Sequence, residues 1–141
     1  MLRKYQTEDL EDVLTVWATA SAIAHPFLST AFLAGERHNI ATLYLPNSET
    51  WVWEAEGRAA GFISLLGNEV GGLFVDPALH RMGIGQALMD HARTLHGDLE
   101  VEVFKANLIG RRFYEKYGFV LMHELIHEET GQAALRLRLA A

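Results

Sequence analysis

The chain reads LFVDPALHRMGIGQAL from Leu73 to Leu88, and this stretch decides its fold. A run of β-forming residues stops at Asp76-Pro77, and a basic turn then leads through Gly83 and Gly85 into an apolar pattern typical of a helix. The unpaired N–H groups and the dipole of a helix start attract an anion, and glycine lets that anion approach the backbone. The stretch therefore predicts a phosphate-binding turn between a strand and a helix.

The composition of the chain excludes several classes of protein. The 141 residues, 50% of them apolar, suffice for one domain with its own core, and we expect residues 1–141 to form that domain. The net charge of -6 argues against nucleic acid as a partner, and the absence of cysteine excludes disulfides and thiolate chemistry. No window approaches the ~18 apolar residues of a membrane span, so we expect no membrane partner and a cytoplasmic location.

Hydrophobic periodicity predicts a mixture of strands and helices around the opening stretch. A first helix covers residues 10–18, a second begins at Ser29 and ends at Pro46, and two more follow Gly83 and Asn107. The paired Gly71-Gly72 predicts a β-bulge or a close approach of a ligand to the backbone. The predicted strands are Leu2–Tyr5, Trp51–Glu56, Ala60–Leu66, Glu69–Val75, Leu99–Phe104, Phe119–Glu128 and Ala133–Leu139.

A second motif lies downstream, where Asn107 is followed by RRFYEKYGF from Arg111 to Phe119. Together with the turn HRMGIG that begins at His80, it resembles the GNAT superfamily of N-acetyltransferases. The stretch from His25-Pro26-Phe27 to Trp51-Val52-Trp53-Glu54 is similar to small stand-alone bacterial members of that family. The family's turn reads Gln/Arg-x-x-Gly-x-Gly/Ala, so His80 departs from the pattern at the first position. The family's second segment reads Asn…Phe-Tyr-x-x-x-Gly-Phe. A dinucleotide-binding fold, by contrast, needs a third glycine that this turn lacks.

The resemblance implies both a fold and an activity. The expected fold is mixed α+β or α/β, with a central, mostly antiparallel, splayed sheet flanked by helices. The expected activity is direct transfer of an acetyl group from acetyl-CoA to a primary amine, on a small molecule or on a protein lysine or N-terminus. No metal is expected. A non-catalytic module that binds or senses acyl-CoA is the alternative, and the protein could be a monomer or a homodimer.

The resemblance also implies roles for individual residues. Tyr114 is the expected acid for the departing thiolate. Glu69 and Glu102 stand where members of the family carry a catalytic glutamate, and a water chain without a single base is the other possibility. The residues implied to bind the cofactor are Leu73, Phe74, Val75, His80, Arg81, Met82, Gly83, Ile84, Gly85, Gln86, Asn107 and Tyr114.

Two further features concern the acceptor and a metal. His25 and Phe27 flank a proline at a predicted helix break, where we expect them to line the entrance for the acceptor. The run from His123 to His127 matches His-Glu-x-x-His, the signature of zinc hydrolases. That chemistry needs a helix, whereas on the strand predicted here the two imidazoles lie roughly 13 Å apart. The zinc hydrolase is therefore a remote alternative.

Overall fold

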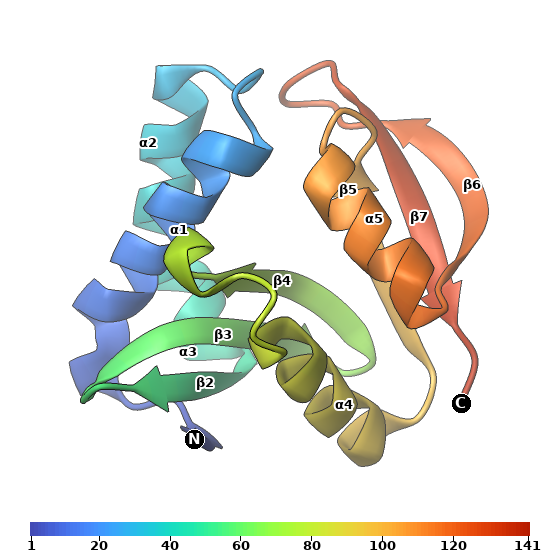
Figure 1. Ribbon diagram of the computed structural model, residues 1–141. Coiled ribbons are helices and arrows are strands. Elements are labelled where there is room, and N and C mark those ends of the chain that lie inside the picture. Colours follow the sequence, from blue (N-terminus) through green and yellow to red (C-terminus); the bar gives the residue numbers. More distant parts are fainter.

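A computed structural model describes residues 1–141, and a seven-stranded sheet forms its centre (Figure 1). The strand order is β1-β2-β3-β4-β5-β7-β6. Every neighbouring pair is antiparallel except β4 and β5, so the sheet is mixed and mostly antiparallel, as predicted. The strands are β1 (Leu2–Lys4), β2 (Glu49–Ala55), β3 (Arg58–Leu66), β4 (Glu69–Val75), β5 (Leu99–Phe104), β6 (Val120–Ile126) and β7 (Ala133–Leu139).

The parallel strands β4 and β5 separate soon after they start. They pair only through Glu69 with Glu100 and Val70 with Val101, and Figure 1 shows them diverging beyond that point. From residue 72 to residue 75, β4 is paired with β3 on one side and with no strand on the other. The splayed sheet is therefore confirmed, and it leaves a backbone edge inside the molecule.

A β-bulge marks the point at which the two strands part. Ser64 of β3 lies opposite Gly72, whereas Leu65 lies opposite Val70, so that Gly71 is the extra residue on β4. A bulge bends its strand and increases the local twist. The bulge predicted from the glycine pair is thus confirmed, and it turns β4 away from β5.

Helices cover both faces of the sheet because alternate strand residues point to opposite sides. On β3, Phe62 packs in the core formed with α1, and the next residue, Ile63, packs in the core formed with α4 and α5. The helical segments are η1 (Thr7–Asp9), α1 (Leu10–Ala24), α2 (Thr30–Asn39), η2 (Ile40–Tyr44), α3 (Leu45–Asn47), η3 (Pro77–Leu79), α4 (Ile84–His96) and α5 (Leu108–Tyr117). None of these helices has both the length and the apolar character that crossing a membrane requires.

The second helical region departs from the prediction at its end. Its start is as predicted, because Ser29 caps α2 by accepting a hydrogen bond from the N–H of Phe32. The chain then continues through a π-helix, η2, and Pro46 falls in the first turn of α3 instead of ending the helix. A proline is tolerated there because the N–H groups of a first turn have no helical partner to lose.

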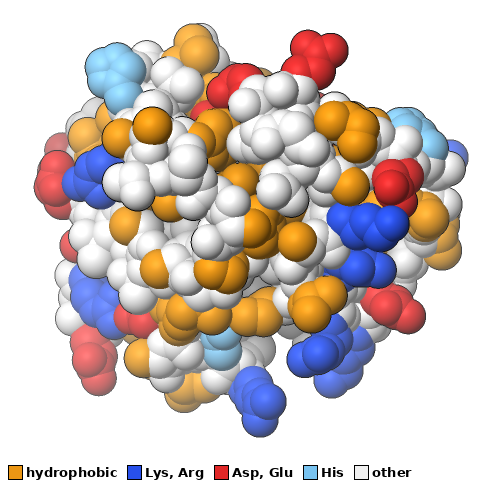
Figure 2. Space-filling model, turned by 90° about the horizontal axis from the view of Figure 1, so that it is seen from above, with side chains coloured by type: hydrophobic (Ala, Val, Ile, Leu, Met, Phe, Trp, Pro, Cys, Tyr) orange, Lys and Arg blue, Asp and Glu red, His pale blue; other side chains and the backbone are white.

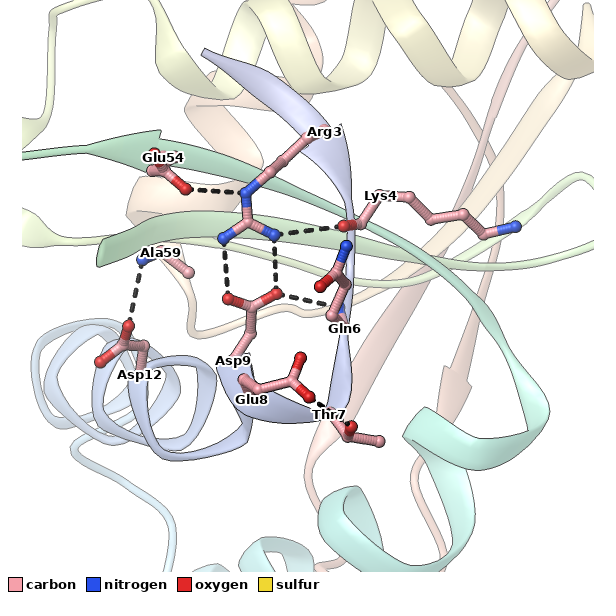
Figure 3. A network of polar contacts seen from close by, with 9 residues as sticks. All are labelled: Arg3, Lys4, Gln6, Thr7, Glu8, Asp9, Asp12, Glu54 and Ala59. Atoms are coloured by element: carbon pink, nitrogen blue, oxygen red, sulfur yellow. Dashed lines mark hydrogen bonds and ion pairs between the residues drawn. The ribbon is translucent and has the colours of Figure 1, made fainter. Parts of the chain in front are cut away.

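A polar network holds the N-terminal strand against the first helix (Figure 3). The Arg3 guanidinium donates to both carboxylate oxygens of Asp9, at 2.8 Å each, and also to Glu54 of β2. Asp9 is buried, and the Arg3 hydrogen bonds hold the pKa of its carboxyl below the ordinary value. The Asp12 carboxylate accepts from the N–H of Ala59. These contacts join β1, β2, β3 and α1.

Candidate active site

The turn between β4 and α4 forms an anion-binding nest. Arg81 and Gly83 both have positive φ angles, of 70° and 80°, and α4 begins at Ile84. The backbone N–H groups from Arg81 to Gln86 donate no hydrogen bond within the protein. Free N–H groups that converge on a helix start, with the helix dipole behind them, bind phosphate oxygens. The turn therefore fits the pyrophosphate of a CoA thioester.

The two glycines of the turn serve different purposes. Gly83 has a left-handed backbone and open space beside it, so that the turn requires its conformation and an anion can approach it. At Gly85 the position of a Cβ would lie 3.3 Å from the Phe113 ring of α5, so this glycine makes room for helix packing. The sequence argument assigned both glycines to the anion, and the structure assigns one of them to the protein interior.

The unusual first residue of the turn has a structural partner. The Nε2 atom of His80 lies 3.1 Å from the carbonyl oxygen of Val75, to which it donates. Asp76, the residue that follows the strand, accepts from the N–H of Ala78 and pairs with Arg58. His80 thus ties the turn back to the end of β4, and the N–H groups of the following residues stay free for an anion.

A cleft of about 330 Å³ lies where β4 and β5 separate. Its walls come from both sides of the sheet, since α1 and α2 supply one wall and α5 supplies another. The residues from the sequence prediction that line it are His25, Glu69, Leu73, Phe74, Glu102, Asn107 and Tyr114. A thioester laid along the free edge of β4 could therefore be reached by an amine from the opposite side of the sheet.

Tyr114 presents its phenol to this cleft from α5. The residue is 7% exposed, and its ring packs edge-on against Phe113 and Phe119. Its hydroxyl makes no hydrogen bond within the protein, and burial raises the pKa of Tyr114 above its ordinary value of 10.0. Tyr117, on the same helix, bonds to Asp90 of α4 and so joins the two helices. A protonated phenol without a protein partner is available to a ligand in the cleft.

The two candidate glutamates differ in their surroundings. Glu69 pairs with Arg136 of β7, with Nη1 and Oε2 2.6 Å apart, and Arg136 also pairs with Glu100. Glu102 lines the same cleft but makes no hydrogen bond or ion pair within the protein. Of the two carboxylates, Glu102 is therefore the one free to accept a proton from a bound amine.

His25 and Asn107 meet in the cleft although they are far apart in the sequence. The Asn107 Oδ1 atom caps α5 by accepting from the N–H of Gly110, so its Nδ2 is the donor that lies 3.2 Å from His25 Nε2. The His25 ring must accept through Nε2 and carry its proton on Nδ1. Asn107 thus has the helix-capping role, and the edge-on rings of Phe27, Phe74 and Phe104 enclose the imidazole.

We predict that His25 makes stability depend on pH between 6.5 and about 4. Burial lowers the pKa of His25 from 6.5 to about 4. In that range the unfolded chain takes up a proton that the folded His25 does not, so the free energy of unfolding falls as the pH falls. Replacing His25→Gln should flatten this part of the curve in urea unfolding at a series of pH values. His38→Gln, at an exposed site on α2, should keep the wild-type slope, and equal slopes in all three proteins would contradict the prediction.

The sequence prediction missed several walls of the cleft. Phe27 was expected at the entrance, but it packs behind His25 and against Phe104 and does not line the cleft. Phe104 lines it instead, and its place two residues after Glu102, on the same face of β5, could have identified it. Glu36 of α2 also lines the cleft, and burial raises the pKa of its carboxyl. Nothing local in the sequence distinguishes Glu36 from a surface glutamate.

The His-Glu-x-x-His segment lies on a strand, as predicted. β6 carries His123 to Ile126 in extended conformation, and the His127 ring contacts Thr130 and Phe104. The chemistry of this signature needs both imidazoles on one face of a helix. The segment therefore lacks the geometry of a zinc hydrolase.

The surface seen from above the molecule carries both apolar and basic side chains. Figure 2 shows hydrophobic side chains across the middle of this face, with Lys and Arg side chains toward its lower right and others on its left. The basic residues of α5 and of the segment before it include Lys105, Arg111 and Arg112. Lys105 pairs with Glu124, so Arg111 and Arg112 are the cations of this group that are free to attract an anionic ligand.

Comparisons with known proteins agree with this geometry. The family model of the Acetyltransferase (GNAT) domain matches residues 46–121, which is 76 of the 141 residues. The chain is 32% identical over 131 residues to the peptidyl-lysine N-acetyltransferase YiaC of Escherichia coli strain K12. The aligned residues cover 92% of this chain and 90% of that protein.

Solved structures show the same fold. The solution structure of apo-form YjaB from Escherichia coli superposes with a TM-score of 0.89 at 26% identity and covers 100% of this chain and 98% of that one. The PaiA N-acetyltransferase of Thermoplasma acidophilum, crystallised with coenzyme A, has a TM-score of 0.76 at 19% identity and covers 96% of each chain. The splayed strands, the phosphate turn and these matches together establish that the chain belongs to the GNAT family of acetyl-CoA-dependent N-acetyltransferases.

Proposed function

We propose that this enzyme acetylates lysine side chains of proteins. The observation that carries the proposal is the cleft between β4 and β5, which has walls from both sides of the sheet and contains Tyr114 and an unpaired Glu102. A lysine side chain is long and narrow enough to reach a thioester through such a cleft while its backbone stays at the surface. The relatives named peptidyl-lysine N-acetyltransferases, 32% and 33% identical, support the same acceptor.

Acetyl-CoA would supply the acetyl group as a thioester, and the described residues fit it. The free N–H groups from Arg81 to Gln86 suit its pyrophosphate, and the unpaired edge of β4 from Leu73 to Val75 suits the pantetheine amides in the manner of an added strand. Arg81 and Met82 are exposed beside the turn, where Arg81 can pair with a phosphate. Asn107 contributes by fixing the start of α5, the helix that carries Tyr114.

The reaction then needs proton transfers by residues of the cleft. Glu102, or a water beside it, accepts a proton from the lysine ammonium, and the neutral amine attacks the thioester carbonyl and forms the new C–N bond. As the C–S bond breaks, the Tyr114 hydroxyl donates its proton to the sulfur, so that free thiol leaves. The second proton that the nitrogen loses as the amide forms restores the Tyr114 phenol, and Glu102 returns its own proton to solvent. Glu69 keeps Arg136 in place across β4, β5 and β7 in this scheme.

Labelled acetyl-CoA and an array of lysine peptides test the acceptor. We expect label on peptides with an internal lysine and a blocked N-terminus, and none on matched peptides in which arginine replaces that lysine. A panel of free amines, comprising polyamines, amino acids and aminoglycosides, runs in parallel. Turnover of a free amine without any turnover of a peptide would refute the protein acceptor and leave the acetyltransferase activity intact.

A cytoplasmic location, and a monomeric or dimeric state, stay predictions.

A further inference from the structure

A second cavity, larger than the catalytic cleft, lies between η2 and the β3–β4 hairpin. Its volume is about 470 Å³, within the range of small-molecule and side-chain pockets. One wall is the π-helix, through Ile40, Leu43 and Tyr44, and the other is the end of β3, through Leu65 and Leu66. Nothing in the acetyl-transfer scheme above uses this space.

The second cavity adjoins the cleft. The residues that line both are Trp17, Glu36, Glu69, Gly71, Gly72 and Phe74. The β-bulge at Gly71 therefore lies at the border between the two. A ligand whose amine reaches the thioester can extend into the second cavity without leaving the protein surface.

The lining of the second cavity selects for apolar groups. Its hydrophobic walls include buried Ile40, Leu45 and Phe62, and its rim carries Leu43 and Leu66, which are 53% and 57% exposed. π-Helices are rare in proteins, and those that do occur are often found at functional sites. Exposed leucines around a concave apolar surface gain free energy when a ligand covers them.

Carboxylates line the junction instead. Glu36 accepts from the Tyr44 hydroxyl at 3.2 Å, and Glu69, which also lines both cavities, is paired with Arg136. Glu36 is therefore the carboxylate that attracts a lysine ammonium to the junction, and the apolar part of the same acceptor is directed into the second cavity. The arrangement distinguishes a charged end from an apolar end of one ligand.

We propose that the second cavity is a specificity pocket for a bulky apolar side chain of the acceptor polypeptide, an inference that rests on the proposed lysine acceptor. In an extended peptide, side chains two residues apart point to the same side and lie about 7 Å apart. Two adjoining cavities therefore accept a lysine and the residue two positions away from it. The acceptor sequence has Leu, Met or Phe at that position.

Acetylation of designed peptides by the intact enzyme tests the pocket. Each peptide has one lysine among Gly and Ser residues and a single leucine placed at each position up to three residues on either side. We expect kcat/KM to rise about tenfold with leucine two residues from the lysine, on one side or the other, relative to the peptide without leucine. The peptide without leucine reports the basal activity.

Two substitutions at the rim should remove this preference. Leu43→Ser and Leu66→Ser change exposed residues that line only the second cavity, so both variants should fold and should keep the basal activity on the peptide without leucine. Leu95→Ser, at a 45% exposed site on α4 outside both cavities, is the matched control and should keep the preference. The expected signature is loss of the tenfold gain in the rim variants alone.

The outcomes separate this inference from the proposed function. Equal turnover of all the lysine peptides, a leucine preference at another position, or a preference that survives both rim substitutions would overturn the pocket while the lysine acceptor stands. No turnover of any lysine peptide, with turnover of free amines, would refute the proposed function itself.

Discussion

Replacing Tyr114→Phe should lower kcat about 10²–10⁴-fold, the contribution typical of a positioned acid. The substitution removes one hydroxyl from a ring held by Phe113 and Phe119, so the packing of α5 should not change. The KM for acetyl-CoA should change little, because the role proposed for the hydroxyl is to protonate the departing sulfur. Steady-state kinetics with an acetylated lysine peptide as product measures both constants.

The pKa of Tyr114 adds a second expectation to this experiment. Burial raises this pKa above 10.0, so the phenol stays protonated through the neutral range. Tyr114 therefore needs no second residue to keep its proton. The matched control is Tyr5→Phe, which removes a hydroxyl from a residue that lines neither cavity and should keep wild-type kcat. A Tyr114→Phe enzyme with kcat within about threefold of the wild type would exclude tyrosine as the acid.

Placing a carboxylate in the phosphate turn, with Gly83→Asp, should raise the Kd for acetyl-CoA at least about 100-fold. A carboxylate that faces the phosphates costs several kcal/mol through repulsion of like charges. The variant should still fold, because aspartate tolerates a left-handed φ better than most residues, is favoured at a helix start, and has open space at this position. Isothermal titration with acetyl-CoA or CoA measures the loss.

A glycine elsewhere in the chain provides the control for the turn. Gly57, in the β2–β3 turn, has a φ of 78°, close to the 80° of Gly83, and also has nothing within 4 Å of a Cβ. Gly57→Asp therefore imposes the same backbone strain and the same added charge away from the ligand. If both variants lost affinity equally, the charge near the phosphates would not be the cause.

Local patterns in the sequence predicted most of the secondary structure. The strand from Glu69 to Val75 has the predicted bounds, and α4 begins one residue after Gly83 and ends before Gly97, as expected. These features depend on side-chain periodicity, on glycine conformations and on helix ends, which act between residues a few positions apart. The π-helix was not predicted, because nothing in the local pattern distinguishes it from a continued α-helix.

Residue roles in the cleft depended on contacts between distant parts of the chain. Glu69 and Glu102 look alike in the sequence, and only the approach of Arg136, 67 residues after Glu69, separates an ion-paired carboxylate from a free one. His25 and Asn107, 82 residues apart, likewise share a hydrogen bond that sets the imidazole tautomer. Such pairs form when strands and helices pack, so spacing along the chain does not reveal them.

By itself the sequence determined the donor half of the chemistry. A strand, a glycine turn and a helix start are contiguous from Leu73 to Leu88, so the phosphate site forms from neighbours in the chain. The acceptor half was decided by tertiary structure alone, because the bulge at Gly71, α2, η2 and β7 must come together before either cavity exists. Hydrogen bonds within a turn are local, whereas a cavity is enclosed by surfaces that only long-range packing brings together.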